Sequence, residues 1–368
     1  MAFSFLDSDQ GTCDSSAVSG VLDDRHLSRQ KADLPSLLFK THIARKRWLL
    51  AVLLIAALVI FIASLLVGAY HLTPGDVVKA LLGLSHEKQQ MLIWNIRLPR
   101  TVASVVVGAG LAISGLFLQA LLRNPLASPS TLGISQGAAF GAAVSVVVFK
   151  LKYLPIAIFA FGGALLATAA ILFIGRLKRL TPESIILAGV ALSSLFSAST
   201  VLIQYIATET ELAAIVFWTF GDVARSSWRE IGVTALLAFG AIVFLCFKSW
   251  DFMAIESGEE SAKGLGVSVE KLRWQGMLVV AIVSSVATAF HGVIAFVGLI
   301  APHAARRLFG MNYIILVPAT AMLGALLLLG ADTVGRIIIG SGGLPVGVIT
   351  SFMGAPLFLY LLMRGYRR

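Results

Sequence analysis

The sequence contains few charged residues, and this shortage limits what the chain can be. Only 13% of its 368 residues are Asp, Glu, Lys or Arg, whereas 58% are hydrophobic, and the mean hydropathy is +0.89. A soluble domain is usually about a quarter charged and about half apolar. A chain of this composition cannot bury all of its apolar surface in one aqueous core. The shortage of charge therefore excludes an ordinary soluble globular protein.

Cysteines and catalytic motifs are also scarce. The two cysteines, Cys13 and Cys246, lie far apart, one in a polar stretch and the other in an apolar run, so they form neither a disulfide framework nor a metal cluster. The sequence has no phosphate-binding G-x-x-x-x-G-K-[ST] loop, no H-E-x-x-H zinc motif and no G-x-S-x-G nucleophile motif. We therefore expect no enzymatic activity in this chain and no resident cofactor or metal.

Long apolar runs recur along the sequence, and each approaches the roughly 20 residues that a helix needs to cross a bilayer. Because only helices and closed barrels satisfy their backbone groups in lipid, we predict an all-α polytopic membrane protein, with about ten spans in a compact bundle. The expected spans lie within residues 48–69, 101–122, 132–149, 154–175, 184–206, 231–247, 275–290, 291–307, 313–329 and 346–363. The stretch 291–307 is short, and it is interrupted by Gly298 and Pro302.

Basic residues give the chain a formal net charge of +10, and they collect in short segments between the apolar runs. This pattern favours loops on one face of a membrane over a nucleic-acid surface. Most of these residues fall on one side if 291–307 is a span, and the bias then places both termini in the cytoplasm. Residues 1–45 are polar and lack the pattern of a signal peptide, so we predict a disordered cytoplasmic tail followed by a membrane domain over residues 46–368.

Glycine and alanine recur three or four residues apart in several expected spans. Small residues at this spacing let helix backbones approach closely in lipid. The glycines in question are Gly108 and Gly115, Gly137 and Gly141, and Gly162 and Gly163. Their recurrence predicts tight contacts between the spans.

Asp332 is the only acidic residue near the interior of an expected span, and it precedes Arg336 by four residues. On a helix this spacing favours an ion pair. A proton relay would need a series of buried acidic or histidine side chains. The pattern therefore disfavours a carrier that is driven by an ion gradient.

The longest hydrophilic segment between spans covers residues 249–274. Within it, the stretch SGEESAKGLGV predicts a short helix that begins at Glu259 and ends at Gly264 or Gly266. Such a helix suits docking into a groove of a soluble partner, although a solvated connector would have a similar composition. Two further segments are GLFLQALLRNPLASP and VGLIAPHAARRLFG. Each ends an apolar run with a basic residue and a nearby proline, and this likeness suggests an internal repeat.

Four segments taken together resemble one known family. They are IRLPRTVASVVVGAGLAISGLFLQALLRNPLASPSTLGISQGAAFGA, GEESAKGLGV, GVIAFVGLIAPHAARRLFG and LPVGVITSFMGAPLFLYLL. In this order and spacing they are similar to the FecCD-type permeases, the membrane subunits of type II ABC importers for iron–siderophore complexes, haem or cobalamin. The likeness extends from about Trp48 to the end of the chain.

The resemblance implies that residues 46–368 form a permease domain of the inner membrane. Its expected cargo is a metal chelate, first a ferric siderophore, with haem or cobalamin as alternatives and molybdate-type oxyanions after them. The expected partners are a second copy of the chain or a close paralogue, two ABC ATPase subunits that bind ATP and magnesium, a periplasmic or lipid-anchored binding protein, and membrane lipid. No nucleic acid is expected.

The resemblance also implies roles for individual residues. The stretch GEESAKGLG falls where the family has its coupling helices, so that contacts with the ATPase are expected at Glu259, Glu260, Ala262, Leu265 and Gly266. These coupling helices lie within the loop 249–274.

Two other groups of residues match functional positions of the family. The RNPLA turn falls at the cytoplasmic gate, which points to Asn124 and Leu126. Arg97, Arg100 and Arg336 match outward arginines that receive acidic residues of the binding protein, and charge-assisted contacts of this kind orient a partner and speed its encounter.

Two rival functions stay open: an ion-coupled secondary transporter, and a membrane receptor that transports nothing.

Overall fold

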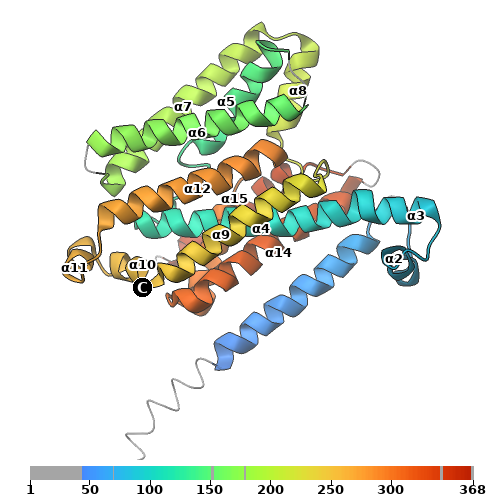
Figure 1. Ribbon diagram of the computed structural model, residues 1–368, viewed down its shortest axis with the longest axis horizontal. Coiled ribbons are helices and arrows are strands. Elements are labelled where there is room, and N and C mark those ends of the chain that lie inside the picture. The colour runs from blue at the N-terminus through green and yellow to red at the C-terminus, as the bar shows by residue number, and fades with distance from the viewer. Residues whose placement is uncertain (1–43, 69, 151–152, 178–179, 340–342, 366–368) are drawn as a thin grey trace, which may run out of the picture. The chain divides into compact units, whose positions relative to one another are not determined.

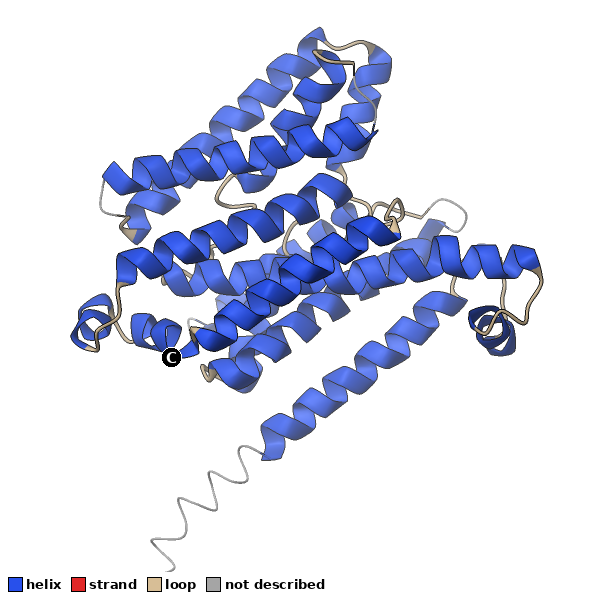
Figure 2. Ribbon diagram, viewed as in Figure 1, coloured by secondary structure: helices blue, strands red, loops and turns tan. Residues whose placement is uncertain are grey.

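The described part of the chain consists of helices joined by short turns (Figures 1 and 2). The computed structural model describes residues 44–68, 70–150, 153–177, 180–339 and 343–365. The predicted disordered tail over residues 1–45 lies outside this part, except for Ala44 and Arg45, which begin the first helix. Residues from Val52 onward form one compact unit, and the contacts described below lie within it.

The helices follow one another without long irregular segments. In chain order they are Ala44–Leu66, α2 (Pro74–Leu81), α3 (Glu87–Leu92), the π-helical turn η1 (Ile93–Arg97), α4 (Leu98–Leu121), α5 (Ile134–Val147), α6 (Tyr153–Leu177), α7 (Pro182–Ile206), α8 (Glu209–Thr219), α9 (Trp228–Phe247), α10 (Ser249–Glu256), α11 (Glu259–Gly264), α12 (Val269–His291), α13 (Val297–Phe309), α14 (Tyr313–Ile339) and α15 (Val346–Gly365).

Within the described residues, seven helical segments are long and apolar enough to cross a membrane, judged by length and composition. Two shorter apolar helices, Ile134–Val147 and Val346–Tyr360, add to them. A separate helix, α13, occupies the difficult stretch 291–307. The prediction of an all-helical polytopic membrane protein is therefore confirmed, and a helix occurs at every position where a span was expected.

Helix α4 lies at the centre of the bundle. It packs against α9, α12, α13 and α14, while α5, α6 and α7 form a second group that meets α12 through α6. Figure 1 shows this second group on one side of α12 and α4 on the other. Most side chains of α4 are buried all around its axis, as expected for a helix that is apolar on every face.

Glycines bring the central helices into backbone contact. A Cβ atom added to Gly108 would lie 2.4 Å from the carbonyl oxygen of Gly324 in α14, and one added to Gly115 would lie 1.6 Å from that of Gly298 in α13. The prediction of tight contacts is confirmed for these residues and for the glycines of α5. It is wrong for Gly162, which has nothing within 4 Å of an added Cβ.

The connection between α12 and α13 is sharply bent. Gly292 ends α12 with a φ of 73°, and Phe296 begins α13 with a φ of 66°. Left-handed backbone is easy for glycine and costly for a bulky residue. The bend separates α12 from α13, and it returns the chain toward the end of α4, which α13 contacts.

Candidate functional sites at the two ends of the bundle

The central helix defines two ends of the molecule. With 24 residues, α4 is roughly 36 Å long at about 1.5 Å per residue. Arg97 and Arg100 lie at its start, and the turn 122–127 follows its last residue. The predicted docking residues and the predicted gate therefore lie at opposite ends of the bundle.

At the first end, Asp332 is fully buried between two arginines. Its Oδ1 is 2.8 Å from Nε of Arg100, and its Oδ2 is 3.0 Å from Nη2 of Arg336. The predicted i,i+4 pair of Asp332 with Arg336 is confirmed. Arg100 was not foreseen as a partner because 232 residues separate it from Asp332.

Arg97 and Arg336, which both lie at this end of the bundle, bind the end of the first helix. Arg97 donates from Nη1 to the carbonyl oxygens of Leu65 and Leu66 at 2.7 and 2.9 Å, and Arg336 donates to that of Ser64 at 2.7 Å. The last carbonyls of a helix lack partners within the helix and carry partial negative charge. The two guanidinium groups therefore cap this helix from two sides.

In the described structure Arg97 and Arg336 face other segments of the same chain. Arg97 is 4% exposed and Arg336 is 7% exposed, because both are occupied by contacts within the chain. The side chain of Arg100 is 12% exposed and is paired with Asp332. Arg97 and Arg336 therefore present little surface in this structure. The docking role of all three residues stays a prediction.

We expect the Arg97→Leu substitution to destabilise the protein, whether or not a partner binds there. The carbonyls of Leu65 and Leu66 would lose their donors in a buried place, which costs about 1–3 kcal/mol per unsatisfied group. The apparent melting temperature of the purified protein in detergent should fall. The Arg225→Leu substitution is the control, because Arg225 is an exposed arginine. An unchanged melting temperature for Arg97→Leu would contradict the capping role.

At the opposite end, the predicted short helix is confirmed as α11, which begins at Glu259 and ends at Gly264. Leu265 follows it and is 73% exposed, Glu260 is exposed, and Gly266 has open space around it. Ala262, in contrast, is fully buried and faces the chain itself. Ala262 therefore lacks the exposed surface that a contact with an ATPase would need.

The side chain of Glu259 also contacts another helix of the same chain. Its carboxylate pairs with the guanidinium of Arg273, which is 2% exposed. The hydrogen bond from Arg273 lowers the pKa of Glu259 below its ordinary value, so that this carboxylate stays ionised at neutral pH. The most exposed part of the predicted coupling surface thus consists of Glu260, Leu265 and Gly266, and the side chain of Glu259 is 31% exposed.

The predicted gate residues form an ordered turn directly after α4. Oδ1 of Asn124 accepts a hydrogen bond from the backbone N–H of Leu126 at 2.8 Å, and the carbonyl of Asn124 accepts one from the N–H of Ala127 at 3.1 Å. Leu126 is 44% exposed. The side chain of Asn124 shapes the turn, and the role of Asn124 and Leu126 as a gate stays a prediction.

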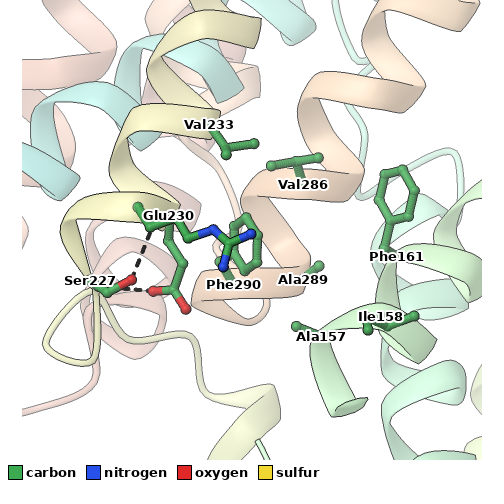
Figure 3. A pocket seen from close by; sticks show the side chains of 10 residues that line it. Ala157, Ile158, Phe161, Ser227, Glu230, Val233, Val286, Ala289 and Phe290 are labelled. Atoms are coloured by element: carbon green, nitrogen blue, oxygen red, sulfur yellow. Dashed lines mark hydrogen bonds between the residues drawn. The ribbon is translucent and has the colours of Figure 1, made fainter. Parts of the chain in front are cut away.

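A cavity of about 570 Å³ lies between α6, α9 and α12 (Figure 3). Phe161, Val233 and Val286 contribute to its largely apolar lining. The backbone N–H of Ser227 donates to the carboxylate of Glu230 at 2.9 Å, so that these two polar groups serve the N-terminal cap of α9. Arg229 also lines the cavity, so its wall carries the charged groups of Arg229 and Glu230 among apolar side chains.

Metal-ligating side chains do not gather in the part of the chain that the structure describes. No group of three or more His, Cys, Asp or Glu residues has a geometry that could hold a metal ion there. The chemistry of the described residues is therefore that of hydrogen bonds and ion pairs at the two ends of an apolar bundle.

Comparisons with known proteins match this architecture. Residues 54–364 match the model of the FecCD transport family. A Methanocaldococcus jannaschii protein assigned as an ABC transporter permease is 48% identical over 330 residues, which are 86% of this chain and 94% of that protein. The vitamin B12 import system permease protein BtuC of Vibrio cholerae is 36% identical over 324 residues, which are 88% of this chain and 95% of BtuC.

Two further similarities are informative. The Fe(3+)-citrate import system permease protein YfmE of Bacillus subtilis is 38% identical over 332 residues, which are 88% of this chain and 97% of YfmE. Among solved structures, an inward-facing transporter assigned to the metal-chelate type of ABC transporters has a TM-score of 0.77 and 33% identity, and the match covers 86% of this chain and 99% of that one.

Proposed function

Because the chain belongs to the FecCD transport family and is a permease of the ABC transporter class, we propose that it passes a metal chelate across the cell membrane into the cytoplasm. The chelate comes from a substrate-binding protein, and ATP hydrolysis in a separate partner subunit drives the movement. A ferric siderophore is the first candidate. Cobalamin, ferric citrate and haem are the alternatives.

The named cargoes of relatives support a chelate over a bare ion. BtuC of Vibrio cholerae is named for vitamin B12 import, and YfmE of Bacillus subtilis for ferric citrate import. Both cargoes are metals held by an organic ligand. A mainly apolar path would suit such a cargo, because the binding protein selects the chelate and the path needs only to let it pass.

The observation that carries the proposal is the exposed coupling surface of Glu260, Leu265 and Gly266. It lies at the same end as the turn that holds Asn124 and Leu126, because Arg273 contacts both α11 and the last turn of α4. A docking surface for a soluble partner next to a candidate gate is the arrangement that an ATP-driven permease needs. We propose that this end faces the cytoplasm, with both termini, since the basic loops favour it.

The assembly that we propose contains a second copy of the chain or a close paralogue and two ABC ATPase subunits, which bind ATP and magnesium. A periplasmic or lipid-anchored binding protein docks at the opposite end, near Arg97, Arg100 and Arg336. Since Arg97 and Arg336 are buried, they support that surface from beneath.

An ion-coupled carrier is the rival function. Such a carrier needs a buried acid that is free to exchange a proton or bind a cation. Asp332 already faces two cations, Arg100 and Arg336. This arrangement favours the ATP-driven permease.

We expect the Leu265→Asp substitution to weaken association with the ATPase subunit by about tenfold, because it removes an apolar contact of more than about 1 kcal/mol and places a charge in the proposed interface. Binding of the purified ATPase to the permease in detergent measures the effect. The control is Leu84→Asp, since Leu84 is 74% exposed and lies near the opposite end. Equal ATPase binding by both variants would contradict the assignment of the coupling surface.

A reconstitution experiment tests the function itself. Proteoliposomes that contain the permease, its ATPase and its binding protein should accumulate a radiolabelled ferric siderophore, cyanocobalamin or ferric citrate only when ATP is supplied. Uptake that needs no ATP and stops on addition of a proton ionophore would instead establish the ion-coupled carrier.

A further inference from the structure

Two glutamates flank the hinge between α10 and α11. Glu256 is the last residue of α10 and Glu259 is the first residue of α11. Gly258 lies between them with a φ of 130°, a conformation that suits glycine. Each glutamate pairs with a different arginine, and each arginine reaches the same turn of α4.

The first connection runs from Glu256 to α4 through Arg306, and we name it the Glu256 link. Oε1 of Glu256 is 2.9 Å from Nη2 of Arg306, and it also accepts a hydrogen bond from the hydroxyl of Tyr313 at 2.9 Å. Nη1 of the same arginine donates to Oε1 of Gln119 at 2.9 Å. Gln119 in turn donates to the carbonyl of Leu299 at 3.1 Å.

The second connection runs from Glu259 to α4 through Arg273, and we name it the Glu259 link. The Nη2 group of Arg273 pairs with Glu259, while Nε donates to the carbonyl of Leu121 at 3.1 Å. The remaining group, Nη1, donates to the carbonyl of Leu180, just before α7, at 3.2 Å. One buried guanidinium thus joins α11, α4 and the segment between α6 and α7.

Both links end on the last turn of α4, immediately before the predicted gate. Gln119 and Leu121 are the third-last and last residues of that helix. The backbone N–H of Asn124 donates to the carbonyl of Gln119 at 3.2 Å. A displacement of this helix end therefore displaces the turn that holds Asn124 and Leu126.

The physical character of the links suits the transmission of movement. A guanidinium is a planar, rigid fork that holds several acceptors in fixed directions. The side chains of Arg306 and Glu256 are 16% and 13% exposed, so that water cannot readily replace either partner. A movement of α10 and α11 that left α4 behind would strain the partly buried pair of Glu256 and Arg306 and would draw Glu259, whose side chain is 31% exposed, away from the buried Arg273. A buried charge that loses its partner is unfavourable.

We propose that Arg273 and Arg306 are positioning residues that transmit movement of α10 and α11 to the end of α4 and to the turn of Asn124 and Leu126. Arg273, which is buried, and Arg306, which is partly buried, do not need to touch the chelate or the ATPase for this role. The inference rests on the proposed function, because it assigns a route of movement within an ATP-driven permease.

The experiment separates transmission of movement from a purely structural role. Gln119→Leu removes the contact of Arg306 with α4 and leaves the ion pair with Glu256 in place. The double variant Glu256→Arg/Arg306→Glu reverses the pair and keeps a contact with Gln119, whose amide group can donate as well as accept. Arg307→Ala is the matched control, since Arg307 is the next residue and is exposed.

Each variant is reconstituted with the ATPase and the binding protein, and three quantities are measured: ATPase binding, stimulated hydrolysis, and chelate uptake per ATP hydrolysed. For Gln119→Leu we expect ATPase binding and hydrolysis to stay near those of the parent, while uptake per ATP falls by about tenfold, which corresponds to roughly 1.4 kcal/mol of lost coupling. The double charge reversal should recover uptake relative to Arg306→Glu alone. Arg307→Ala should match the parent.

Several results would overturn the proposal. They are an unchanged ratio of uptake to hydrolysis in Gln119→Leu, a parallel fall of ATPase binding, hydrolysis and uptake, or no recovery in the double variant. If Gln119→Leu does not fold, Arg306→Lys, which keeps the cation and loses the planar fork, should give the same selective loss of uptake. A parent complex that shows no ATP-dependent uptake at all would contradict the proposed function. The inference about Arg273 and Arg306 would then lose the function on which it rests.

Discussion

Substitution of Gly115 by alanine is expected to prevent stable assembly of the bundle. The added Cβ would lie 1.6 Å from the carbonyl oxygen of Gly298, and no rotation of a side chain can relieve a clash with backbone. Overpacking in a tight core typically costs 1–3 kcal/mol and occasionally more, and we expect a loss of at least roughly 3 kcal/mol here. Size-exclusion chromatography in detergent, together with the apparent melting temperature, measures the loss.

Gly110 provides the matched control on the same helix. It is buried like Gly115, but an added Cβ would meet side-chain atoms of Ala238 and Val283 at 3.4 Å, which is ordinary contact. Alanine also favours a helix over glycine by about 1 kcal/mol. Gly110→Ala should therefore fold about as well as the parent. A Gly115→Ala protein with the elution profile and melting temperature of Gly110→Ala would refute the backbone contact between α4 and α13.

The Asp332→Ala substitution is expected to destabilise the end of the bundle where Arg100 and Arg336 meet. Asp332 is fully buried, and its removal leaves two guanidinium groups without their counter-charge. Removal of one partner from a buried ion pair typically costs about 3–5 kcal/mol. The apparent melting temperature should fall clearly, and the yield of protein from membranes should fall with it.

A second variant identifies the cause of this loss. Asp332 is the hydrogen-bonded acceptor of Arg100, so the double variant Arg100→Ala/Asp332→Ala leaves one fewer unpaired charge. The double variant should be more stable than Asp332→Ala alone, because the effects of residues in contact are not additive. If the double variant is less stable than the single one, loss of packing rather than an unpaired charge explains the effect.

The amino-acid sequence alone predicted most of the helices. The expected span 184–206 corresponds to α7 (Pro182–Ile206), and the short helix from Glu259 to Gly264 was placed correctly. Apolar runs and helix-ending glycines are local signals, so they can be recognised in the sequence without knowledge of the fold. The expected span 313–329 is shorter than α14, which continues to Ile339 past the ion pairs of Asp332 with Arg100 and Arg336.

The sequence did not predict the helices α2, α3, α8 and α10. Each has 11 residues or fewer, too short for a span. A capping box begins α2 and α8, whereas α3 and α10 have no side-chain cap. The links through Arg273 and Arg306 were also missed. Arg273 lies in the hydrophilic segment 249–274 and Arg306 in the expected span 291–307, and neither position indicates these contacts. Their partners on α4 lie 152 and 187 residues away.

The sequence by itself determined the membrane class, the order of the spans, the short helix from Glu259 to Gly264 and the resemblance to the FecCD family, because composition and local motifs carry these features. Only the tertiary structure decided the role of each side chain. It separates Gly163, where an added Cβ would lie 2.2 Å from the carbonyl oxygen of Gly137, from Gly162, which meets nothing. It also shows that Arg97, which the resemblance placed on the outer surface, caps the first helix. Both outcomes depend on which neighbour packs against a residue, and that neighbour is set by contacts far apart in the chain.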